Sequence, residues 1–192
     1  MNGQGWWYLT RTSGILAWAL LGASVALGLL QSARSTPNRS PAWFVDLHRG
    51  LAGLGCWALG VHLVALLADS FANLELLDLL VPLRADVSPG GVAWGVVALY
   101  LVAVVEITSL ALRLLSWRTW RRVHYLGLAV FWLATLHGLL AGTDAQSPLL
   151  RIPAVALLVT LAGITVLRFA RVGTRTSLTV EGSAADTITP SS

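Results

Sequence analysis

Residues 46–62 read DLHRGLAGLGCWALGVH, an apolar run with a histidine near each end. They lie inside a longer apolar segment, from about Trp43 to Ala68, and about 20 helical residues are enough to cross a bilayer. His48 and His62 are 14 residues apart, so an ideal helix holds their side chains within about 40° of one face. The stretch therefore predicts a membrane-spanning helix that carries two imidazoles on one side, one near each membrane surface.

The composition agrees with a protein that lies in a bilayer. Of 192 residues, 56% are hydrophobic and 11% are charged, whereas an average soluble domain has roughly 25% charged residues. The positive charge comes from arginine alone. Because the arginines cluster at the ends of apolar segments, we expect no nucleic-acid partner. The single cysteine, Cys56, excludes an intramolecular disulfide, and we expect it to be a small buried side chain.

Five apolar segments are long enough to cross the membrane as helices. They run from about residue 8 to 30, 43 to 68, 92 to 115, 123 to 141 and 149 to 169. We therefore expect an all-α, polytopic bundle of about five transmembrane helices within a domain of residues 1–170. Residues 171–192 have no apolar run, which predicts a disordered cytoplasmic tail. Residues 74–80 are amphipathic and should lie along the outer interface.

The arginines predict the orientation, because cytoplasmic loops carry an excess of basic residues. Ten lie on one side of the predicted bundle: Arg34, Arg39, Arg49, Arg113, Arg118, Arg121, Arg122, Arg168, Arg171 and Arg175. Three lie on the other side: Arg11, Arg84 and Arg151. The N-terminus should therefore lie outside and the C-terminus in the cytoplasm. The bias toward Ala, Leu, Gly and Arg suggests a bacterial chain, for which we expect the inner membrane.

A second stretch repeats the histidine pattern. Residues 120–138 read WRRVHYLGLAVFWLATLHG, with His124 and His137 13 residues apart. One predicted helix separates the two histidine-bearing helices, so both run in the same direction. His48 should then face His124, and His62 should face His137, with about 20 Å between the two levels. Two imidazoles fill both axial positions of a haem iron, which suits electron transfer, so the sequence predicts two b-type haems, one in each leaflet.

Two points about these histidines stay open. Membrane histidines also serve as interhelical hydrogen-bond partners, although ionisable groups inside a bilayer are costly and usually functional. Thirteen residues leave His124 and His137 more than about 100° apart on an ideal helix. Local over- or underwinding, a kink or different rotations of the two haems must absorb this difference.

The two histidine pairs, with LDLLVP at residues 77–82 and Thr108-Ser109, resemble the ferric reductase-like transmembrane domain family over roughly residues 11–144. The family includes the membrane portion of NADPH oxidases, metalloreductases and the haem-binding membrane subunit of bacterial periplasmic methionine sulfoxide reductase systems. The resemblance implies two haems stacked across the membrane, with all four histidines at ligand positions. No Gly-rich nucleotide fingerprint or soluble flavin domain follows the last apolar segment, so we expect a separate flavoprotein partner.

Several arginines are candidates for contacts with haem propionates. Arg49, Arg121 and Arg122 adjoin the inner histidines, and a guanidinium suits a carboxylate, although these residues also set the topology. Arg11 and Arg84 are similar candidates on the outer side.

Aromatic and acidic residues complete the candidate set. Phe131 lies about two turns beyond His124 on nearly the same face; the resemblance implies an aromatic between the haems there, and core packing is the alternative. Glu106 lies inside the third apolar segment, where a carboxyl group is a functional candidate for a proton, a quinone headgroup or an arginine, or is a neutral structural residue. Trp117 and Trp120 suit an aromatic belt at the inner interface.

The sequence therefore predicts a membrane oxidoreductase component that carries electrons between a cytoplasmic flavin- or NAD(P)H-linked donor and an acceptor outside. The resemblance implies a ferric chelate, oxygen or a periplasmic redox partner as the acceptor. A quinol-linked cytochrome b, with Glu106 near the quinone, is an alternative. A haem-free membrane scaffold or transporter subunit is an alternative of another class.

Overall fold

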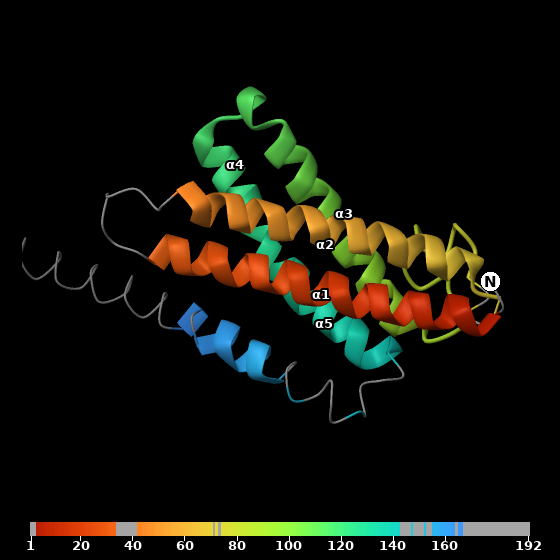
Figure 1. Ribbon diagram of the computed structural model, residues 1–192. Helices are drawn as coiled ribbons and strands as arrows, with labels where there is room; N and C mark the ends of the chain where they lie inside the picture. Colours follow the sequence, from red (N-terminus) through yellow and green to blue (C-terminus); the bar gives the residue numbers. More distant parts are fainter. Residues whose placement is uncertain are drawn as a thin grey trace, which may run out of the picture.

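The computed structural model describes residues 3–33, 42–70, 72, 74–142, 147, 152, 155–163 and 165–166. Helices account for most of this part of the chain (Figure 1). In chain order they are α1 (Gly3–Ala33), α2 (Ala42–Ala68), α3 (Pro89–Leu110), the short 3-10 helix η1 (Leu112–Leu114), α4 (Trp117–His124) and α5 (Leu126–Ala141).

Four stretches of these helices are long and apolar enough to cross a membrane. They are Gln4–Ser32, Ala42–Ala68, Pro89–Leu110 and Trp117–Ala141. Large apolar side chains point outward along them, with Trp57 77% exposed and Leu110 85% exposed, where a soluble protein would place charges. The prediction of an all-α membrane bundle is confirmed. Residues 152, 155–163 and 165–166 are helical inside the fifth predicted segment; the rest of that segment and residues 171–192 lie outside the described residues.

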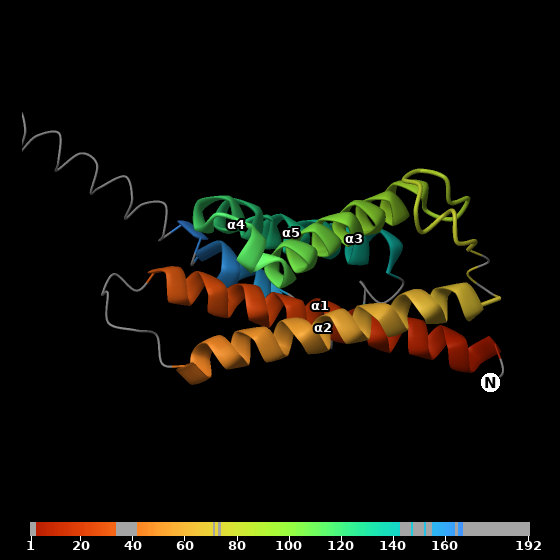
Figure 2. The same ribbon diagram turned by 90° about the horizontal axis from the view of Figure 1, so that it is seen from above.

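The helices form two groups. α1 packs along α2, while α3 packs against α5 and α4, and α1 also contacts α5. Figure 2 shows α1 and α2 side by side in the lower part of the view, with α3, α4 and α5 above them. Among the described helices, α2 makes no extensive close backbone contact with α3, α4 or α5. Side chains therefore span the interval between α2 and the second group.

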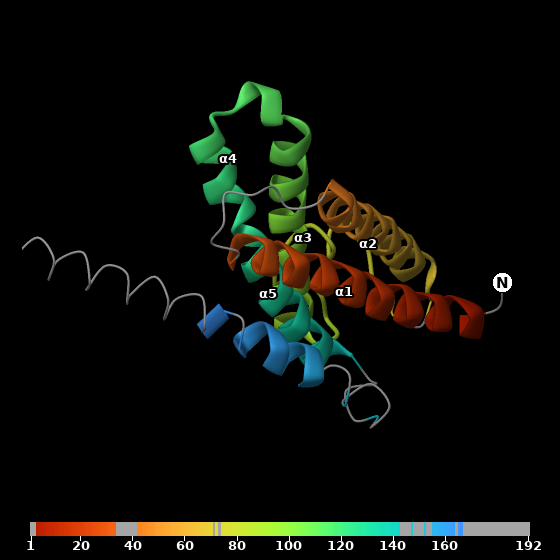
Figure 3. The ribbon, with the colours of Figure 1, turned by 60° about the vertical axis from the view of Figure 1, so that its left-hand side comes forward.

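The fourth predicted helix is two helices. The sequence predicts one helix over residues 123–141, but the structure has α4 and α5 with a break at Tyr125. Ser116 caps the start of α4, since its hydroxyl oxygen accepts from the Thr119 N–H at 3.2 Å. At the break, the Leu128 N–H donates to the Tyr125 carbonyl at 3.1 Å, three residues back rather than four, which tightens the turn. The third predicted helix likewise ends early, at Leu110, and η1 links it to α4 at one end of the bundle (Figure 3).

The amphipathic segment at residues 74–80 consists of turns rather than a regular helix. Its Asp78 is buried and accepts a hydrogen bond from the Glu75 N–H at 2.8 Å. The Tyr100 hydroxyl of α3 donates to the Leu80 carbonyl. The loop is therefore fastened to the helix that follows it.

Candidate functional site

Two pairs of imidazoles meet between the two groups of helices. The ring centroids of His48 and His124 are 5.9 Å apart with 69° between their planes. Those of His62 and His137 are 6.5 Å apart with 74° between their planes. α2 supplies one ring of each pair, and α4 and α5 supply the others. At a rise of 1.5 Å per residue, the two levels are about 20 Å apart along α2.

α1 accepts a hydrogen bond from each histidine of α2, on the side of the ring that is turned away from the facing histidine. The His62 Nδ1–H donates to the Thr10 carbonyl at 2.7 Å, and the His48 Nδ1–H donates to the Ser24 carbonyl at 2.9 Å. Thr10 and Ser24 are 14 residues apart, as are His48 and His62. Because α1 and α2 run antiparallel with this matched spacing, one helix supplies equivalent acceptors at both levels.

α3 holds the opposite histidines in the same manner. The His137 Nδ1–H donates to the Gly91 carbonyl at 2.8 Å. His124 Nδ1 lies 3.4 Å from the Ser109 hydroxyl oxygen, whose own proton is donated to the Val105 carbonyl at 2.7 Å. The Ser109 oxygen therefore acts as the acceptor for the imidazole, in a long and weak contact.

These contacts fix which ring nitrogen is available. A carbonyl oxygen can only accept a hydrogen bond, so Nδ1 carries the proton and a neutral ring keeps its lone pair on Nε2. Such a bond behind the ring is the usual way in which a metal-binding histidine is oriented. Each pair can thus offer two Nε2 atoms to one ion.

Glycines let the rings lie close to the helices behind them. A Cβ built on Gly14 would lie 2.9 Å from His62 Nδ1, and one on Gly95 would lie 2.8 Å from His137 Nδ1. A Cβ on Gly28 would lie 3.4 Å from His48 Cε1. Sequence reasoning missed these positions. The signal was present, because Thr10 and Ser24 are each followed by a glycine four residues later, in step with the histidine spacing.

The paired rings fit a group that takes two axial imidazoles. Two imidazoles bound to opposite sides of one metal, each through a nitrogen at about 2 Å, have ring centroids about 6 Å apart. The observed distances of 5.9 and 6.5 Å match this value. Within the described residues, no group of three or more His, Cys, Asp or Glu side chains could hold a bare ion. Two facing imidazoles are the axial ligand set of a haem iron, whereas a structural zinc site takes four protein ligands.

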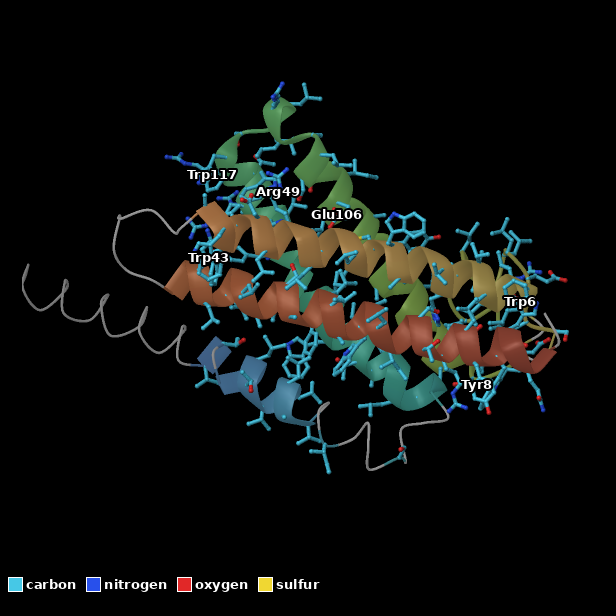
Figure 4. The ribbon with its side chains drawn as sticks, in the orientation of Figure 1. Trp6, Tyr8, Trp43, Arg49, Glu106 and Trp117 are labelled. Carbon is cyan, nitrogen blue, oxygen red and sulfur yellow. The ribbon has the colours of Figure 1, made fainter. Side chains whose placement is uncertain are left out.

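The arginines predicted to contact propionates have varied surroundings. Arg49 is exposed and lies at the same end of the bundle as Trp117 (Figure 4). Arg122 is also exposed. The Arg121 Nε–H donates to the Tyr125 hydroxyl at 3.1 Å, so this side chain is already directed along α4. Their contact with propionates stays a prediction.

The outer arginines already have contacts of their own. Arg84 pairs with Asp78 at 3.0 Å and with Glu75 at 3.1 Å. The Arg11 guanidinium lies over the Trp7 ring, 4.0 Å from its centroid. Arg84 thus holds the loop, and contacts of Arg84 and Arg11 with propionates stay predictions.

Phe131 lies on α5 and packs toward α1. It is 2% exposed, its ring centroid is 5.9 Å from that of Trp18, and a Cβ on Gly22 would lie 2.9 Å from its ring. The Trp18 Nε1–H donates to the Thr135 hydroxyl at 2.9 Å, which fixes this contact between the helices. These are the contacts of core packing, and a place between two haems stays a prediction.

Glu106 lies on α3, and the Cys56 thiol of α2 is near enough to feel its charge. Figure 4 labels Glu106 in the middle part of the bundle. A role for this carboxyl group with a proton, a quinone headgroup or an arginine stays a prediction, as does a neutral structural role.

The two inner tryptophans form a stack on His124 rather than a simple belt. The Trp117 and Trp120 centroids are 4.6 Å apart, and the Trp120 and His124 centroids are 4.7 Å apart. Trp117 is 60% exposed, whereas Trp120 is half-buried. Only Trp117 has the exposure that suits the predicted interfacial position.

Fold and site together define a class: an all-helical membrane protein with facing imidazole pairs at two levels. Residues 13–141, more than half of the chain, match the family model of the ferric reductase like transmembrane component. The chain therefore belongs to this family, whose members are membrane electron-transfer components and generally bind haem. All four histidines lie within the matched residues. Comparisons with curated proteins and with solved structures give no match.

Proposed function

We propose that the chain holds two b-type haems, one at each histidine pair, and carries electrons across the bacterial inner membrane. The observation that carries this proposal is the orientation of the imidazoles. Each Nδ1 is directed to a helix behind it, and each ring faces a second ring at a distance that suits one shared iron. A purely structural histidine would need neither the matched spacing nor the facing partner.

The residues of this chain supply position, ligation and an apolar environment. His48 and His124 would hold one haem and His62 and His137 the other, and haem held by two imidazoles would supply one-electron transfer. Backbone carbonyls of α1 and α3 hold three of the rings in place, and the Ser109 hydroxyl of α3 contacts the fourth, His124. With levels about 20 Å apart, the two sites divide the hydrocarbon core into shorter steps than one site would.

The arrangement of charge supports an orientation in the membrane. Ten arginines lie on the side of the predicted cytoplasmic loops and three on the other. The family resemblance suggests the direction of electron flow: electrons enter from a cytoplasmic flavin- or NAD(P)H-linked protein and leave to an acceptor outside. A ferric chelate, oxygen or a periplasmic redox partner is the proposed class of acceptor.

Sealed liposomes test this function. The purified protein is inserted into vesicles with ferricyanide trapped inside, and dithionite is added outside. The expected result is reduction of the trapped ferricyanide, which stops in His62→Ala and in His124→Ala because each removes one level of the path. Trp57→Phe, on the exposed face of α2, is the matched control and should retain the wild-type rate. Haem-loaded protein that reduces no ferricyanide would contradict the proposal, and protein without haem after expression with ample haem would favour the scaffold alternative.

A further inference from the structure

Two buried polar atoms have no partner. Within the part of the chain that the structure describes, the buried side-chain polar atoms without a hydrogen bond are Thr10 Oγ1 and Trp120 Nε1. A buried donor left without an acceptor costs about 1–3 kcal/mol, so native proteins rarely keep one without a reason. The neighbours of each atom indicate which hydrogen-bond acceptor could satisfy it.

Each of the two residues contacts one histidine pair. Trp120 stacks on His124, with centroids 4.7 Å apart and 22° between the planes. Thr10 supplies the carbonyl that accepts from His62 Nδ1 at 2.7 Å. The unpartnered atoms therefore lie beside opposite pairs, one at each level.

The free hydroxyl of Thr10 is unusual among its neighbours. A threonine in a helix ordinarily donates to the carbonyl four residues earlier. Thr12 does so to Tyr8 at 2.8 Å, and Thr135 does so to Phe131 at 2.8 Å. Local back-bonding is thus the rule in these helices, and Thr10 departs from it.

The chemistry of the donors narrows the choice of group. An indole N–H can only donate, so Trp120 requires a hydrogen-bond acceptor, and the Thr10 hydroxyl can donate to an acceptor of the same kind; a carboxylate is among the strongest acceptors. The polar atoms at the edge of a haem are its two propionate carboxylates. Resting on the proposed function, we propose that Trp120 Nε1–H and Thr10 Oγ1–H each donate to a propionate of the haem at their own level. The two residues thus position the inner and the outer haem.

Two conservative substitutions test the proposal. Trp120→Phe keeps an aromatic ring on His124 but removes the N–H, and Thr10→Val keeps the branched shape but removes the hydroxyl. Trp117→Phe and Thr12→Val make the same chemical changes nearby and serve as matched controls. Haem release to apomyoglobin is measured, together with a redox titration and the propionate bending bands in the resonance Raman spectrum. His62→Ala should keep only the inner haem and His124→Ala only the outer haem. Their spectra and potentials therefore show which Raman band and which midpoint potential belongs to each haem.

The expected result is selective. Trp120→Phe should release the inner haem about tenfold faster, and Thr10→Val the outer haem, because each loses a hydrogen bond to a charged group. The Raman band and midpoint potential of that haem alone should shift, which a merely structural role would not cause. Haem-loaded variants with unshifted bands would overturn this inference and leave the proposed function intact. So would an equal effect of Trp117→Phe. A wild-type protein without haem would overturn both.

Discussion

Gly95 lies behind His137, and a Cβ at this position would lie 2.8 Å from the Nδ1 atom. Real Cβ atoms essentially never approach another atom so closely. The ring would have to move, and with it the hydrogen bond to the Gly91 carbonyl at 2.8 Å. The absence of a side chain at Gly95 is thus part of how His137 is held.

We therefore expect Gly95→Ala to remove the outer haem and leave the inner one. Alanine is the better helix former by about 1 kcal/mol, so a loss cannot come from helix propensity. Gly138→Ala is the control, because a Cβ there meets nothing within 4 Å, although the residue adjoins His137 in the chain. Haem content by pyridine haemochrome measures the outcome. A full haem complement in Gly95→Ala would show that the ring has room to move.

At the scale of elements, α4 is the short helix on which the inner pair depends. It has eight residues, too few to be stable alone in water, and its cap at Ser116 lies two turns before His124. The break at Tyr125 separates α4 from α5. The hydrogen bonds of the longer helix therefore do not continue regularly into α4.

Ser116→Ala should therefore loosen the inner haem. Loss of an N-cap costs about 1 kcal/mol, and fraying of α4 disturbs His124 but not His137. In a thermal titration followed at the Soret band, the inner haem should leave at a lower temperature than in the wild type. Ser116→Asp, which keeps a capping oxygen, should restore it. An unchanged release temperature in Ser116→Ala would mean that tertiary contacts alone hold α4.

The helices and turns of the structure can be compared with those that the sequence predicts. Apolar length predicts the spans, because crossing a bilayer requires a nearly fixed number of apolar residues. The 13-residue spacing of His124 and His137 indicates an irregularity between them, and the break at Tyr125 lies there. Its position was not predictable, since Tyr125 is neither proline nor glycine. For residues 74–80 the sequence predicts only an amphipathic interfacial segment, because so short a pattern does not distinguish a helix from the turns that the structure has there.

At the scale of the whole molecule, the site joins two groups of helices. α1 and α2 form one group and supply His48 and His62, while α3 to α5 supply His124 and His137. The matched 14-residue spacing in α1 and α2 repeats the same contact at both levels. Histidine pairing was predictable from spacing and helix direction. The tryptophan stack on His124 was not predicted, because the fourth helix was expected to begin at residue 123. α4 begins at Trp117, so Trp117, Trp120 and His124 follow one another at spacings of three and four residues, on one face of the helix.

The measurement that tests this account most directly is the haem content of histidine variants in pairs. Wild-type protein should hold about two b haems per chain by pyridine haemochrome. His48→Ala and His124→Ala should each lose one haem, and the double variant should lose no more than either, because both residues serve the same iron. Combining His48→Ala with His137→Ala should instead remove both haems. Loss of both haems in the first double variant, or retention of both in any single variant, would contradict the paired-ligand account.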